Sequence, residues 1–107
     1  MADYRMTRSA ALVIRALAAG HAYGFDIMDA TGLSSGTVYP TLRAMEKAGL
    51  VRSRWEDRRA ATREGRPRRR MFDLTPDGRQ AVAEADAKLA KAAALLSDLL
   101  GEQAAGG

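Results

Sequence analysis

The pattern of apolar positions predicts three helices in the first half of the chain, over residues 7–19, 24–31 and 35–48. The first has apolar side chains on nearly every face, so we expect it to be buried on several sides. In the third, Val38, Leu42 and Met45 recur at i, i+4 and i+7 and predict one buried stripe. Gly32 suits the left-handed residue of a tight turn between the second and third helices.

A period of two follows the third helix and predicts two strands, over residues 50–56 and 70–75. Trp55 is in phase with Val51, so we expect this tryptophan in the core. The run Gly65-Arg66-Pro67 between the strands is typical of a turn. The two strands therefore form a β-hairpin with a long tip.

The last predicted helix begins at Thr75-Pro76 and ends near Leu100, with a threonine N-cap and proline at its first position. A helix of about 25 residues is about 38 Å long, which exceeds what so small a core covers. We therefore expect part of its apolar seam to form a homodimer, while packing on the first helix of the same chain accounts for the rest. The seam has spacings of three and four: Val82, Ala85, Leu89, Ala92, Leu96 and Leu99.

The order of these elements defines the expected fold class. It is mainly α with a small β-hairpin wing, that is, a winged helix-turn-helix followed by a long C-terminal helix. We expect the DNA-binding domain over residues 1–74, the dimerisation helix over residues 75–101 and a disordered tail over residues 102–107.

Charge is concentrated in the predicted hairpin. The chain has 107 residues, a formal net charge of +4 and 17 basic residues, nine of which are arginines between positions 52 and 70. The same segment holds only three acidic residues. Arginine binds phosphate and base edges bidentately, so the segment favours a nucleic-acid partner over a merely solvated loop.

Composition excludes most catalytic chemistry. The chain has no cysteine and a single histidine, His21, which removes disulfides, thiolate and multi-histidine metal sites and a histidine-based triad. We therefore expect no enzyme and no cofactor. No window approaches the roughly 18 apolar residues of a membrane span, so we expect a soluble, cytoplasmic protein without a membrane partner.

The exposed face of the third helix is polar and suits the major groove of DNA, which admits one helix. Pro40 conflicts with a regular helix interior by about 3 kcal/mol, and local conflicts of this kind tend to mark function. In the hairpin, arginines beside the turn suit phosphates or the minor groove. An ordinary solvated helix face and flexible solubilising charge are the alternatives. The predicted DNA-binding residues are Ser35, Gly36, Thr37, Tyr39, Pro40, Arg43, Lys47, Arg66, Arg68 and Arg69.

Five motifs and one tryptophan together resemble the PadR family of bacterial transcriptional regulators. They are Tyr23-Gly24-Phe25-Asp26-Ile27, Ser35-Gly36-Thr37-Val38-Tyr39-Pro40-Thr41-Leu42, Glu46-Lys47-Ala48-Gly49-Leu50-Val51, Trp55, Gly65-Arg66-Pro67 and Leu74-Thr75-Pro76-Asp77-Gly78. The resemblance implies a homodimeric repressor, often relieved by a small ligand. It also implies that the helix bearing Tyr39-Pro40 enters the major groove, the wing touches the backbone and the terminal helix dimerises.

The chain departs from the family pattern in two respects. Met71-Phe72 stands where members commonly have two adjacent tyrosines. The connection from the second to the third helix is shorter than in many members, and the terminal region is one modest helix, which carries no aromatic residue. Family members that bind drugs between their terminal helices use a tryptophan there, so a ligand pocket does not carry over and the identity of any effector stays open.

Two functions of different classes fit these features. The first is a sequence-specific regulator of transcription that binds double-stranded DNA, most simply a homodimeric repressor on an inverted-repeat operator. The alternative is a winged-helix module for protein interaction or assembly without specific DNA binding. The basic wing and the polar third helix disfavour the alternative, because protein interfaces prefer an apolar centre.

Overall fold

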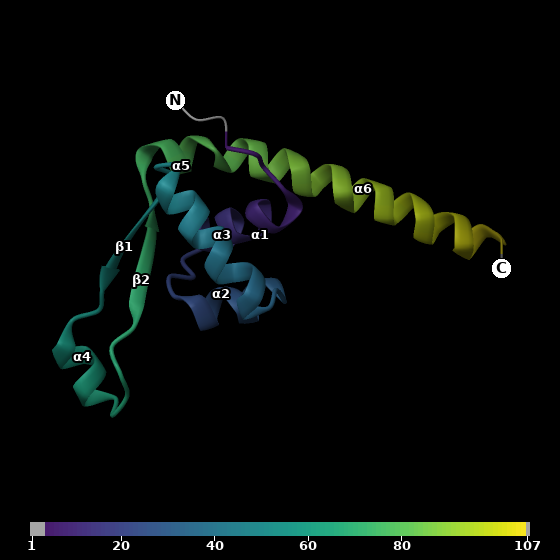
Figure 1. Ribbon diagram of the computed structural model, residues 1–107. Helices are drawn as coiled ribbons and strands as arrows, with labels where there is room; N and C mark the ends of the chain where they lie inside the picture. The colour runs from purple at the N-terminus through teal and green to yellow at the C-terminus, as the bar shows by residue number, and fades with distance from the viewer. Residues whose placement is uncertain (1–3, 107) are drawn as a thin grey trace.

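The computed structural model describes residues 4–106, with side chains up to Gly101. The described chain forms six helices and one antiparallel two-stranded sheet (Figure 1). In chain order they are α1 (Arg8–Ala18), α2 (Gly24–Thr31), α3 (Ser35–Lys47), β1 (Val51–Trp55), α4 (Arg58–Arg63), β2 (Arg70–Leu74), α5 (Pro76–Gln80) and α6 (Val82–Gly106). The expected fold class, a winged helix-turn-helix with a long C-terminal helix, is confirmed.

The first three helices lie where the apolar pattern predicted them. The Thr7 hydroxyl caps α1 by accepting a hydrogen bond from the Ala10 N–H at 3.1 Å. Gly32 ends α2 with φ 76°, the left-handed conformation that favours glycine. The predicted stripe of α3, Val38, Leu42 and Met45, is fully buried. It packs with α1 and Ile27 of α2 in one hydrophobic core.

The hairpin is joined to the helices along β2. The two strands pair in antiparallel register from Val51 with Leu74 to Trp55 with Arg70. The Phe72 N–H donates to the Ala22 carbonyl at 2.7 Å, and Tyr23 forms an isolated bridge with Met71. These bonds attach β2 to the segment that leads into α2, so the position of the wing is fixed relative to the helix-turn-helix.

The prediction that Trp55 lies in the core is wrong. Its side chain is 54% exposed. It is in phase with the buried Val51, as expected, but it pairs with Arg70 at the far end of the ladder. The last buried residue of β2 on that side is Phe72, so the core ends before the strand does.

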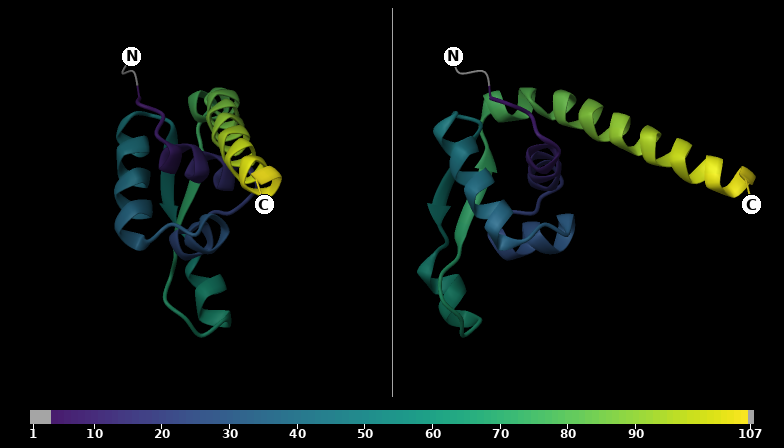
Figure 2. Two further views of the ribbon diagram at one scale, coloured as in Figure 1. Left: turned by 90° about the vertical axis from the view of Figure 1, so that its right-hand side faces the viewer. Right: turned by 45° about the vertical axis from the view of Figure 1, so that its right-hand side comes forward.

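The hairpin tip contains a helix that the sequence pattern did not predict. Helix α4 lies between the strands, at the end of the hairpin far from α6 (Figure 2). Asp57 caps it, because its carboxylate accepts a hydrogen bond from the Arg59 N–H at 3.1 Å. Ala61 is its one buried residue, and Gly65 follows it with φ 66°. The tip is thus a folded unit rather than a simple turn.

The predicted last helix is two helices. Thr75 caps α5 as expected and accepts a hydrogen bond from the Gly78 N–H at 3.0 Å. Thr75 also binds the start of β1, with its N–H on the Leu50 carbonyl and its hydroxyl on the Gly49 carbonyl. These bonds hold α5 against the sheet, whereas α6 packs along α1. The two helices therefore run in different directions, and the helix is interrupted at Ala81.

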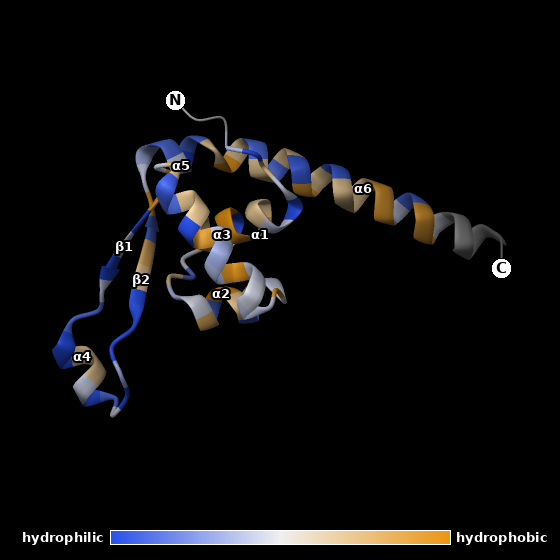
Figure 3. Cartoon of the chain, in the orientation of Figure 1, coloured by the Kyte–Doolittle hydropathy of each residue, from blue (hydrophilic) through white to orange (hydrophobic). Residues whose placement is uncertain are grey.

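Helix α6 extends past its expected end, to Gly106. The sequence predicts a disordered tail over residues 102–107. The side chains of residues 102–106 and the whole of residue 107 lie outside the described part of the chain, so this expectation stays a prediction. The C-terminal part of α6 projects beyond the body of the molecule (Figures 1 and 2). Colouring by hydropathy shows apolar residues along this projecting part and hydrophilic ones along the hairpin (Figure 3).

We predict that Gly78→Ala destabilises the protein. A Cβ at this buried position would meet the backbone carbonyl of Leu50, and backbone cannot move aside as a flexible side chain does. The expected loss is about 1–3 kcal/mol in the free energy of unfolding, the usual cost of overpacking, measured by urea denaturation. Gly101→Ala is the control, because a Cβ there meets nothing within 4 Å. An unaffected Gly78→Ala variant would contradict the close approach of Gly78 to the Leu50 carbonyl.

Candidate nucleic-acid interface

The side of α3 away from the core is polar and largely solvent-exposed. Its stripe of buried residues faces α1 and α2, which leaves the opposite face to solvent. Of the predicted DNA-binding residues on α3, Thr37 and Tyr39 are half-buried. The others are exposed: Ser35, Gly36, Pro40, Arg43 and Lys47. The face therefore offers hydroxyl, guanidinium and ammonium groups on one rigid helix.

Tyr39 is positioned by a close contact with α2. Its ring and hydroxyl lie against Gly24, where a Cβ would overlap with them. The first residue of α2 therefore has to be glycine for this ring to lie where it does. Tyr39 also lines the same cleft as residues of the wing.

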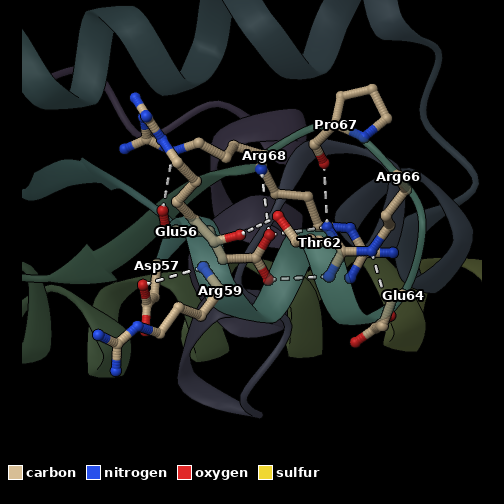
Figure 4. A network of polar contacts seen from close by, with 10 residues as sticks. Glu56, Asp57, Arg59, Thr62, Glu64, Arg66, Pro67 and Arg68 are labelled. Carbon is tan, nitrogen blue, oxygen red and sulfur yellow. Dashed lines mark hydrogen bonds and ion pairs between the residues drawn. The ribbon is translucent and has the colours of Figure 1, made fainter.

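An ion pair organises the wing from within (Figure 4). Arg66 binds Glu56 with two parallel hydrogen bonds, Nη1 to Oε1 at 2.7 Å and Nη2 to Oε2 at 2.9 Å. Its Nε donates to Glu64 at 3.1 Å, and Nη1 also donates to the Pro67 carbonyl at 3.1 Å. The side chains of Arg66 and Glu56 are only 19% and 14% exposed. Arg66, predicted to contact DNA, thus uses most of its donors inside the wing.

The Arg66 guanidinium also determines the ionisation of Glu56. Its hydrogen bonds, with that of the Arg69 N–H, lower the pKa of Glu56 to about 2. The carboxylate of Glu56 is therefore charged at and around neutral pH, and its ion pair with Arg66 persists there.

The three arginines that follow Pro67 are held by aromatic rings. The guanidinium carbons of Arg68 and Arg70 lie 5.7 and 5.5 Å from the centroid of Trp55. That of Arg69 lies 4.0 Å from the centroid of Tyr23. These are cation–π distances. All three guanidinium groups are thus fixed at the boundary between the wing and the helix-turn-helix.

A hydrogen-bonded chain joins the wing to α3. Arg70 donates to the Ser53 hydroxyl from Nε at 3.1 Å and from Nη2 at 2.9 Å. Ser53 in turn donates to the carboxylate of Glu46 on α3 at 2.7 Å. The exposed face of α3 and the wing therefore form one connected surface.

A cleft of about 430 Å³ lies between the start of α2, α3 and the wing. Four arginines and no carboxylate line it, together with aromatic side chains from all three elements. We call it the arginine cleft; its lining residues are Tyr23, Gly24, Phe25, Tyr39, Trp55, Arg66, Pro67, Arg68, Arg69 and Arg70. The predicted residues Tyr39, Arg66, Arg68 and Arg69 are thus brought together in one place.

Sequence reasoning missed four members of this cleft: Tyr23, Phe25, Trp55 and Arg70. The period of two places Trp55 in the core, whereas its side chain is 54% exposed, and Phe25, an apolar residue of the second helix, is 68% exposed. The signal that could have found them is the run Arg68-Arg69-Arg70 opposite Trp55 in the hairpin.

Further basic side chains lie on α4. Arg58, Arg59 and Arg63 are exposed, and with Asp57 and Thr62 they line a shallow hollow on the outside of the wing. Across the described residues, no three histidine or acidic side chains gather as a metal ion would require. None of the helices described combines the length and apolar character needed to cross a bilayer.

Comparison with known proteins agrees with this geometry. Among solved structures, a PadR family regulator of Clostridium difficile has a TM-score of 0.68 and 20% identity, over 88% of this chain and 99% of that chain. A PadR-like regulator of Bacillus cereus has a TM-score of 0.63 and 18% identity, over 85% and 89%. BpsR of Bordetella bronchiseptica, whose DNA binding is regulated by 6-hydroxynicotinic acid, has a TM-score of 0.66 and 24% identity, over 85% and 61%.

At these identities the likeness concerns the fold. No curated protein matches the chain in sequence. The model of the transcriptional regulator PadR-like family matches residues 13–84, which include α2, α3 and the whole wing. The chain therefore belongs to the PadR-like family of transcriptional regulators.

Proposed function

We propose that this regulator is a homodimeric repressor that binds an inverted-repeat operator in double-stranded DNA. The observation that carries the proposal is the continuous surface formed by the polar face of α3 and the arginine-rich wing. A reading helix beside a basic, rigid hairpin suits a base-edge contact flanked by phosphate contacts. A protein-interaction module would instead call for large apolar side chains at the centre of this face, and none of the exposed large hydrophobic residues lies on α3.

The residues divide into two roles. On α3, base and nearby phosphate contacts are assigned to Ser35, Gly36, Thr37, Tyr39, Pro40, Arg43 and Lys47. In the wing, Arg68 and Arg69 contact the sugar-phosphate backbone. Arg66 supports the wing through Glu56 rather than contacting DNA, because its donors are already engaged.

Dimerisation is assigned to the projecting part of α6. Within the predicted seam, Val82, Ala85 and Leu89 pack against the core of the same chain. Four leucines farther along are each more than half exposed: Leu95, Leu96, Leu99 and Leu100. Together with Ala92 they supply the apolar surface that a second copy of α6 would cover. The dimerisation helix thus begins as a core helix and continues as an interface.

The proposed repressor acts in the cytoplasm, where bacterial DNA is accessible, and responds to a small-molecule effector of unknown identity. The effector is suggested by the family and by BpsR, whose DNA binding responds to a small aromatic acid. No aromatic residue of α6 is available to bind such a ligand.

Selection of bound sequences from a random DNA pool tests the proposal directly. The expected result is an inverted repeat whose half-site centres are about 10 base pairs apart, or a small multiple of that, because two reading helices must meet successive major-groove faces about 34–36 Å apart. Recovery of no preferred sequence would exclude sequence-specific repression and favour the interaction module.

We predict that α3 and the wing differ in what they contribute. Arg43→Ala should lower the preference for the selected operator over random DNA by about 1–3 kcal/mol, the value of a base contact. Arg69→Ala should weaken binding to both DNAs alike, since phosphate contacts carry no sequence information. Arg79→Ala, on α5, is the control. Fluorescence anisotropy with both duplexes measures the ratio, and an unchanged ratio for Arg43→Ala would remove α3 as the reading helix.

We predict that Leu96→Asp with Leu99→Asp yields a folded monomer. Each substitution places an unpaired charge in the proposed interface, at a cost of several kcal/mol, while the core residues of α6 stay intact. Sedimentation and circular dichroism should show a helical monomer with weak operator binding. The control, Ala90→Asp with Ala94→Asp, adds the same charge on the opposite side of α6. A double-leucine variant that stays dimeric would move the interface elsewhere.

A further inference from the structure

We propose that Trp55 and Tyr23 are positioning residues, whose rings hold the arginines of the arginine cleft in place to meet one sugar-phosphate backbone of duplex DNA. This inference rests on the proposed DNA-binding function and adds a defined site to it. It also gives a role to two aromatic residues and to Arg70, to which the predicted interface assigned none.

The charge of the cleft calls for a polyanion. Of its four arginines, Arg66 is neutralised by Glu56 and Glu64. The other three, Arg68, Arg69 and Arg70, form no ion pair within the described residues, and no carboxylate lines the cleft. With the two glutamates that bind Arg66 counted, the four arginines leave a net charge of +2 at the cleft, which is of the sign that a nucleic-acid backbone requires.

The rings leave the arginines ready to bind. A guanidinium that lies over an aromatic ring keeps its N–H edge free for an acceptor. Arg68 donates from Nε to the Glu56 carbonyl, and Arg70 donates from Nε and Nη2 to the Ser53 hydroxyl. Each arginine therefore keeps unused N–H donors on its terminal nitrogens. Because stacking already restricts these long side chains, less conformational freedom is lost when a phosphate binds.

The same stacking disfavours a flat aromatic ligand. The ring faces of Trp55 and Tyr23 carry guanidinium groups, so an aromatic molecule would have to displace them. The cleft is also bordered by Tyr39 of α3. A backbone that lies in it is therefore the one next to the groove that α3 reads.

Trp55 supplies a direct measurement, because it is the only tryptophan of the chain. A mixed-sequence duplex several helical turns long is titrated into the full-length protein, and tryptophan emission is followed. We expect a saturable change with the same midpoint as the anisotropy of the labelled duplex. Inorganic pyrophosphate at constant ionic strength should leave the emission unchanged. A saturable response to pyrophosphate at similar concentration would make the cleft a small-anion site and overturn the backbone assignment.

The arginines are tested by the salt dependence of binding to the same duplex. Arg68→Gln with Arg70→Gln should lower the slope of log affinity against log salt by about 1.8 per protomer, since each phosphate contact contributes about 0.9. The matched control is Arg79→Gln with Lys88→Gln, which removes the same charge from α5 and α6 and should keep the slope.

The positioning role is tested with three variants of Trp55. Trp55→Ala should weaken duplex binding about 3- to 10-fold at low salt, because two guanidinium groups lose their ring. Trp55→Phe should restore most of the affinity. Trp55→Leu, which keeps an apolar side chain without a ring, should bind as weakly as Trp55→Ala, because Arg68 and Arg70 then have no ring to lie over.

The outcomes separate this inference from the function on which it rests. Normal duplex binding with an unmoved tryptophan emission and an unchanged slope in the arginine variant would overturn the cleft assignment and leave DNA binding standing. Equal affinities of Trp55→Leu and Trp55→Phe would overturn the positioning role. Absence of duplex binding by the unaltered protein would overturn both proposals.

Discussion

One carboxylate, that of Glu56, holds together a segment that would otherwise repel itself. Nine arginines lie within the hairpin region, and their mutual repulsion opposes a compact tip. Glu56 binds the inner guanidinium of Arg66 at both oxygens and the Arg69 N–H at one of them. Its backbone carbonyl accepts from Arg68 and its N–H donates to the Arg69 carbonyl. The chain from Arg66 to Arg69 is therefore shaped by one residue.

The ion pair of Glu56 also determines where the neighbouring arginines lie. Because Glu56 binds Arg66, the guanidinium groups of the next three arginines lie against aromatic rings instead. These rings belong to Trp55 of β1 and to Tyr23 at the N-cap of α2. The chain of hydrogen bonds through Arg70, Ser53 and Glu46 then joins the wing to α3. The two parts of the DNA-binding surface are thus oriented before any ligand arrives, which reduces the entropy lost on binding.

The sequence was informative where an element depends on its own periodicity. The helices α1, α2 and α3 follow from apolar stripes and from glycines with positive φ. The sequence was misleading where the environment of a residue depends on contacts with distant parts of the chain. The alternation of apolar and polar residues shows on which face of the hairpin Trp55 lies. It does not show that the core ends before this residue. Helix α4 is too short to show an amphipathic stripe, and its cap at Asp57 is the only local signal.

The same limit explains the mixed outcome at the candidate site. Composition and motifs pointed to α3 and the wing, and the structure brings residues of these two segments together in one cleft. They did not separate Arg66, whose partner Glu56 lies ten positions earlier, from Arg68 and Arg69, which form no ion pair among the described residues. Identical residue types in one run take structural or binding roles according to contacts that form only in the folded chain.

In the proposed dimer, the exposed leucines of α6 make operator binding depend on the concentration of the protein. A single chain leaves four of them more than half uncovered, and it carries only one reading helix. With the proposed pairing, the fraction of chains able to occupy a two-fold operator rises with the square of the concentration while monomers dominate. The expression level then affects the occupancy of the operator. Modest changes in synthesis or degradation of the protein produce a sharper change in operator occupancy than a monomeric regulator would allow.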